Sequence, residues 1–83
     1  ADFYVKPISL NSQSDVQLVK DELASGNLVL LNVSSILRNP DKMRELISAV
    51  KAHALQNKGD LAKIDSDKIL VTPSRVKIER RKQ

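Results

Sequence analysis

The segment Leu28 to Val33, with the sequence LVLLNV, constrains the fold more than any other part of the chain. Successive side chains of a β-strand point to opposite faces of a sheet. Here both faces are apolar, with residues 28 and 30 on one and residues 29, 31 and 33 on the other. Such a strand is typical of the centre of a sheet that is covered on both faces. The rest of the chain must therefore cover both faces, or leave one of them to a partner.

Two amphipathic helices are predicted on either side of this strand. The first spans residues 14–25, where Val16, Val19 and Leu23 recur at helical spacing and Gly26 follows as a stop. The second begins at Asn39-Pro40, a capping residue followed by a favoured first helical residue, and ends before Gly59. Its apolar residues form one stripe: Met43, Leu46, Ile47, Val50 and Ala54.

The remaining segments are predicted to be extended. A first strand lies near Phe3 to Ile8, and three short strands follow the second helix: Leu61–Asp65, Lys68–Thr72 and Arg75–Glu79. The chain of 83 residues is long enough for a single domain over residues 1–83. The expected fold is an α/β sandwich (α+β) in which two helices pack on one face of a five-stranded sheet, in the order β-α-β-α-β-β-β.

Two helices can cover only one face of such a sheet. The other face would carry Leu30 and, because Leu70 points opposite to Ile69 and Val71, also Leu70. An uncovered apolar face predicts a partner, most simply a second copy of the chain. We therefore expect a homodimer that is formed through this face.

The composition argues against an enzyme. The chain has no cysteine, and its two glycines cannot form a glycine-rich phosphate loop. His53 has no second histidine with which to build a metal or acid–base site. It lies one residue off the apolar stripe of the second helix, so we expect it at the boundary between core and solvent. Asp60, Asp65 and Asp67 could attract a hard cation, but turn preference explains them better. No catalytic residue, metal site or cofactor is expected.

The basic residues gather at the C-terminal end. Six of the 14 lie between Lys68 and Gln83, where Glu79 supplies the one acidic residue. The segment Lys77 to Lys82 could contact phosphates, so nucleic-acid binding stays open as an alternative. A small-molecule-sensing dimeric regulatory module is a second alternative, since it would share this fold class.

Several segments, in order along the chain, resemble the core domain of the SepF cell-division proteins. These are Val5-Lys6-Pro7, then Glu22-Leu23-x-x-Gly26-Asn27, then Val29-Leu30-Leu31-Asn32-Val33, then Gly59-Asp60-Leu61, and finally Ile69-Leu70-Val71-Thr72-Pro73-Ser74-x-Val76. The similarity runs from about residue 4 to residue 79 and is closer to the archaeal than to the bacterial branch.

The resemblance implies a non-enzymatic adaptor that dimerises and binds the C-terminal tail of FtsZ, the tubulin-like division GTPase. It also implies a cytoplasmic location at the division site, on the inner face of the cell membrane. Attachment to that membrane would use an N-terminal amphipathic helix and linker, which we do not find in this sequence.

The resemblance also assigns roles to particular residues. The family's basic residue for tail binding falls on Lys63, and a phenylalanine of the family falls on Ile69. The Gly-x-x-Tyr pair of the second helix, which is linked to oligomer contacts, falls on Ala52 and Leu55.

Overall fold

The computed structural model describes residues 2–80. Along the chain the elements are β1 (Val5–Ser9), α1 (Gln13–Ala24), β2 (Leu28–Asn32), the 3-10 turn η1 (Ser34–Ile36), α2 (Pro40–Gln56), β3 (Asp60–Asp65) and β4 (Lys68–Thr72). Both predicted helices are present. Within the described residues, no helix is both long enough and apolar enough to span a bilayer.

Local side-chain chemistry sets where the helices begin and end. At the start of α1 the Asp15 carboxylate accepts hydrogen bonds from the backbone N–H groups of Asn11 and Ser12, at 2.9 and 3.1 Å. At the start of α2 the Asn39 side chain accepts from the Lys42 N–H at 3.3 Å. Gly26, with φ +86°, takes the left-handed conformation after α1 that glycine adopts without steric cost.

The sheet has the strand order β1-β2-β4-β3. β1 is parallel to β2, whereas β4 is antiparallel to both of its neighbours. β2 therefore lies inside the sheet, as its apolar sequence predicted, and β1 with Pro7 lies at one edge. β3 forms the other edge.

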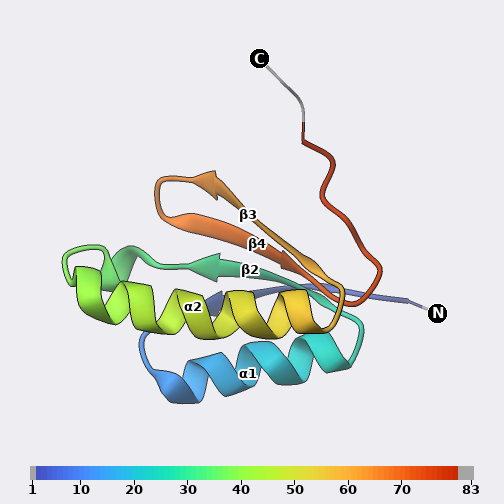
Figure 1. Cartoon of the computed structure of the whole chain (residues 1–83), viewed down its shortest axis with the longest axis horizontal. Coiled ribbons are helices and arrows are strands. Elements are labelled where there is room, and N and C mark those ends of the chain that lie inside the picture. Colours follow the sequence, from blue (N-terminus) through green and yellow to red (C-terminus); the bar gives the residue numbers. More distant parts are fainter. Residues whose placement is uncertain (1, 81–83) are drawn as a thin grey trace.

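Both helices lie against one face of the sheet (Figure 1). We call this the helix face; the core side chains Val29, Leu31 and Val71 lie on it and are fully buried. We call the opposite side the open face. Leu30 and Leu70, which alternate with the core residues, lie on the open face and are only half-buried. β2 is thus apolar on both faces but covered on one.

The prediction of a fifth strand over Arg75–Glu79 is wrong, because the sheet of the described residues has four strands. After β4 the chain turns at Arg75, whose φ of 69° is incompatible with a strand. Its N–H donates to the Lys58 carbonyl at 3.0 Å. The residues that follow are fixed by side-chain hydrogen bonds to Asp60 instead of by a backbone ladder.

Candidate functional site

Lys63 and Ile69 are directly opposite each other across β3 and β4. Opposite residues of an antiparallel pair project from the same face. Ile69 is 6% exposed and belongs to the core, so Lys63 also projects from the helix face. Lys63 is nevertheless exposed, since β3 is the outermost strand. The hairpin places the two predicted binding residues together, and their role in binding stays a prediction.

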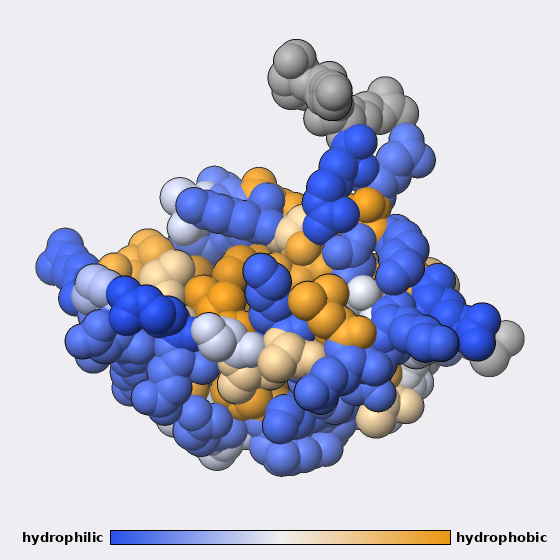
Figure 2. Space-filling view, viewed as in Figure 1, coloured by the Kyte–Doolittle hydropathy of each residue, from blue (hydrophilic) through white to orange (hydrophobic). Residues whose placement is uncertain are grey.

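Apolar residues of α2 and β3 continue the surface around this pair. The flank of α2 that carries Glu45 faces α1, because Glu45 accepts a hydrogen bond from Gln13 at 3.0 Å. Met43 and Ile47, four residues apart on the other flank, are half-buried against the core, as is Leu61 of β3. Figure 2 shows apolar side chains gathered between α2 and the β3–β4 hairpin.

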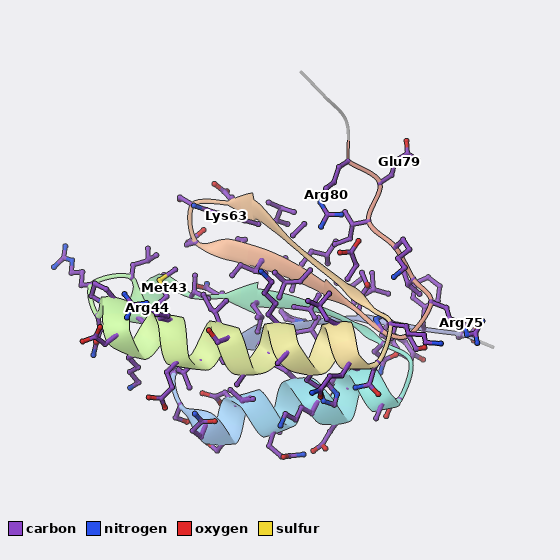
Figure 3. All side chains as sticks on the ribbon, viewed as in Figure 1. Met43, Arg44, Lys63, Arg75, Glu79 and Arg80 are labelled. Carbon is purple, nitrogen blue, oxygen red and sulfur yellow. The ribbon has the colours of Figure 1, made fainter. Side chains whose placement is uncertain are left out.

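We call this surface the α2–β3 patch, and it consists of Met43, Ile47, Leu61, Lys63 and Ile69. Figure 3 shows Lys63 at the same end of the molecule as Met43 and Arg44. Arg44 is paired with Asp41 at 2.9 Å. Lys63 makes none of the ion pairs found within residues 2–80. The patch therefore offers an apolar floor with an exposed ammonium at its rim, which suits an apolar peptide that carries a carboxylate.

Leu30 and Leu70, which we expected on a dimer interface, are register partners in the centre of the open face. Further apolar side chains line the same side of the sheet, including Val5 at 54% exposure in β1 and half-buried Leu28 in β2. The four side chains alternate with residues of the helix face along their strands. The structure thus shows an apolar face around Leu30 and Leu70. Their role in a dimer interface stays a prediction.

Ala52 and Leu55, the expected oligomer contacts, are both exposed on α2. Leu55 is 54% exposed although it is a large apolar side chain. The two residues are three positions apart and therefore neighbours on the helix surface. They lie away from the buried stripe of Leu46, Val50 and Ala54, so a second helix could reach them.

A cavity of about 230 Å³ lies at the other end of the molecule, where both helices end beside the turn after β4. Its walls include Leu23, His53, Thr72 and Pro73. Lys63 does not line it. The sequence predicts that His53 lies at the boundary of the apolar stripe of α2, which agrees with its partial burial. It does not predict the cavity, because the walls come from three separate elements.

An ionic contact that the sequence did not predict joins β3 to the C-terminal segment. The Arg80 guanidinium is paired with both carboxylate oxygens of Asp60, at 3.0 and 3.1 Å. The Ile78 N–H donates to the same carboxylate at 2.9 Å. The Arg80 guanidinium, and after it the amides of Ile78 and Leu61, hold the pKa of Asp60 well below the ordinary value of an aspartate. We call this contact the Asp60–Arg80 clasp.

Two basic residues of the C-terminal segment, Lys77 and Arg80, make contacts within the chain. Lys77 donates from Nζ to the Lys58 carbonyl at 3.3 Å, and Arg80 is held by Asp60. Arg81 and Lys82 lie outside the described residues. Across residues 2–80, no group of three or more histidine, cysteine, aspartate or glutamate side chains is arranged to hold a metal ion.

Comparisons with known proteins agree on one family. The family described as "Cell division protein SepF" matches residues 5–78. A curated cell division protein SepF from Haloferax volcanii is 29% identical over 73 residues, which cover 88% of this chain and 62% of that protein. The chain thus spans less than two thirds of the length of this curated relative.

Three archaeal structures share the fold. A SepF-like protein from Pyrococcus furiosus is 30% identical, with a TM-score of 0.91 over 95% of this chain and 96% of that one. A SepF-like protein from Archaeoglobus fulgidus is 22% identical, with a TM-score of 0.90 over 96% of each chain. SepF from Methanobrevibacter smithii, solved in complex with FtsZ-CTD, is 17% identical, with a TM-score of 0.78 over 94% of this chain and 99% of that one.

Proposed function

The chain belongs to the SepF family of cell division proteins, and we propose that it is a non-enzymatic adaptor that binds the C-terminal tail of FtsZ and links the division ring to the membrane. The observation that carries this proposal is the placement of Lys63 opposite Ile69 on the α2–β3 patch. The Methanobrevibacter smithii SepF, which shares the fold, was solved with FtsZ-CTD bound. That complex supports the choice of partner.

Two parts of the α2–β3 patch would contribute to binding: an apolar floor and a charged residue at its rim. Met43, Ile47 and Leu61 are half-buried and can still lose exposed apolar area to an incoming side chain. Ile69 is too deeply buried to contribute much contact area, and it shapes the floor from below. Lys63 supplies a mobile ammonium that can meet a carboxylate of the tail.

A second copy of the chain is the proposed occupant of the open face. Leu30 and Leu70 form the centre of an apolar surface that both helices leave uncovered. A two-fold dimer would bury the same surface of both copies at once. Such a dimer presents two α2–β3 patches to FtsZ, so that two tails can be bound together and the apparent affinity for a filament rises.

Higher assembly and membrane attachment complete the proposed role. Ala52 and Leu55, exposed on α2, are the contacts proposed to join one dimer to the next. The amphipathic helix and linker that the family resemblance implies would attach the core to the inner face of the cell membrane at the division site, in the cytoplasm.

The test is calorimetric titration of the FtsZ C-terminal peptide of the same organism into the wild type and into Lys63→Ala. Because Lys63 is exposed, we expect the variant to bind with a loss of about 1 kcal/mol, or about fivefold in Kd, and with a smaller dependence on salt. Lys20→Ala on α1 removes the same charge far from the patch and should bind as the wild type does.

Two results would count against the proposal. Absence of measurable binding by the well-folded wild type would remove FtsZ as the partner. Equal affinities of the wild type and Lys63→Ala, at both low and high salt, would remove the α2–β3 patch as the site while leaving FtsZ as the partner. Circular dichroism of each variant verifies that the fold is retained.

A further inference from the structure

β3 is an edge strand, and the Asp60–Arg80 clasp lies on its outer side. The Leu61 N–H donates to the Asp60 carboxylate at 2.8 Å, and the Leu61 carbonyl accepts from Arg80 at 2.8 Å. Both backbone groups of Leu61 are thus bonded to side chains and not to β4. Because the backbone groups of an antiparallel edge strand point alternately inward and outward, those of Lys63 are directed outward as well.

The clasp satisfies the same groups that another strand would use. The Asp60 carboxylate accepts hydrogen bonds from the Leu61 N–H, the Ile78 N–H and two guanidinium nitrogens of Arg80. The Arg80 guanidinium also donates to the Leu61 carbonyl. Unpaired strand edges invite pairing with other chains, and proteins commonly block them. Here the block is a side chain supplied from 19 residues further along the chain.

The block is also easy to remove. The Arg80 side chain is 58% exposed, against 16% for Asp60, so salt or an anion from solution can reach the guanidinium without disturbing the core. Exposed ion pairs of this kind are screened by salt.

The β3 edge has one symmetric partner that fits it well, which is the β3 edge of a second copy. An antiparallel pair related by a two-fold axis at Ala62 sets Leu61 opposite the Lys63 of the second copy, and both outward residues then exchange hydrogen bonds. A register centred on Lys63 would instead set two lysines opposite each other, which is unfavourable. The irregularity between Lys63 and Asp65 ends the usable edge.

We propose that the Asp60–Arg80 clasp is a removable cap on the β3 edge, and that its opening allows the β3 strands of two copies to pair antiparallel about Ala62. This contact is made by the outward backbone groups of Leu61 and Lys63, although the side chains of these residues belong to the α2–β3 patch and that of Ala62 lies on the open face. It needs no FtsZ, so it does not depend on the FtsZ assignment.

The absence of cysteine from the chain makes a direct test possible. In the proposed pair the two Ala62 residues face each other at a non-hydrogen-bonded position, with their Cα atoms about 4.5 Å apart, a separation that a disulfide can bridge. Ala62→Cys is prepared alone, with Arg80→Ala, and with Lys77→Ala, which removes one charge from the same segment but leaves the clasp in place. Each protein is oxidised under mild conditions and analysed on non-reducing gels.

We expect disulfide-linked pairs to form at least ten times faster when Arg80→Ala is present than in the other two proteins. Equal rates in all three would overturn the proposal, because the Ala62 side chain lies on the open face and an open-face dimer would cross-link regardless of Arg80. Absence of cross-linking in all three would overturn it too. Asp60→Asn opens the clasp from its other side and should reproduce the result, with circular dichroism as the control for folding.

Discussion

Gly59, which joins α2 to β3, has no room for a side chain. A Cβ atom at this position would lie 2.3 Å from the Thr72 carbonyl oxygen and 3.2 Å from the carbonyl oxygens of Ala54 and Pro73. All three neighbours are backbone atoms, so no change of rotamer can relieve the contact. Gly59→Ala must therefore move α2 away from the sheet, or move the end of β4.

The expected cost follows from this crowding. Overpacking a well-packed interior typically costs about 1–3 kcal/mol. Three backbone oxygens surround the added methyl group, and the nearest lies much closer than van der Waals contact allows. We therefore expect Gly59→Ala to lower the free energy of unfolding by about 3 kcal/mol. In a domain of this size such a loss lowers Tm by about 12–24 °C.

Gly26 provides the matched control, since nothing lies within 4 Å of its Cβ position but its φ is +86°. Gly26→Ala should cost about 1–2 kcal/mol through left-handed strain alone. Gly26→Asn should recover part of that loss, because asparagine tolerates this conformation, whereas Gly59→Asn should be no better than Gly59→Ala.

Urea unfolding followed by circular dichroism measures all four variants on one scale, provided that the m-value is unchanged. A loss for Gly59→Ala that is no larger than the loss for Gly26→Ala would refute the argument from crowding. A recovery by Gly59→Asn would refute it as well.

Four further predictions concern the core, a helix cap, the clasp and the outer side of α2. Leu31→Ala should lower the free energy of unfolding by about 2–5 kcal/mol, measured in urea, because Leu31 is fully buried. Asn39→Ala should cost about 0.5–2 kcal/mol in the same assay through the lost cap, and Asn39→Ser should restore most of it. Since the pKa of Asp60 is lowered on folding, its contribution is complete above about pH 4 and is lost as the pH falls further. The free energy of unfolding should therefore fall more steeply below about pH 4 in the wild type than in Asp60→Asn. Ala52→Lys should leave the fold and the dimer intact but abolish higher assembly in sedimentation; equal assembly by this variant would contradict its proposed role.

The sequence predicts the helices and the interior strand well because their signals are local. Apolar spacing, a capping residue and a following glycine define each helix, and the double alternation in Leu28–Val33 identifies β2. The pairing of Lys63 with Ile69 also follows from a short hairpin, which the polar turn between them makes predictable.

The prediction of a fifth strand was wrong although Val76 and Ile78 alternate as strand residues do. Their conformation is set by contacts with residues far away in the sequence. Arg75 has a positive φ, and the Asp60 carboxylate accepts a hydrogen bond from the Ile78 N–H, 18 residues further along the chain. A single sequence contains no local signal for such a contact. The clasp and the cavity at the helix ends went unpredicted for the same reason.

Pro7 makes the two edges of the sheet chemically unequal. It lies in the middle of β1 and provides no N–H donor, so this edge is a poor template for a further strand. A sheet with two competent edges can recruit copies without limit, as in a fibril. With β3 as the one competent edge, and only once the Asp60–Arg80 clasp is open, the molecule is monovalent in strand pairing: a single neighbour saturates it. Growth by edge addition then stops at two copies, and any longer polymer must extend through faces and helices.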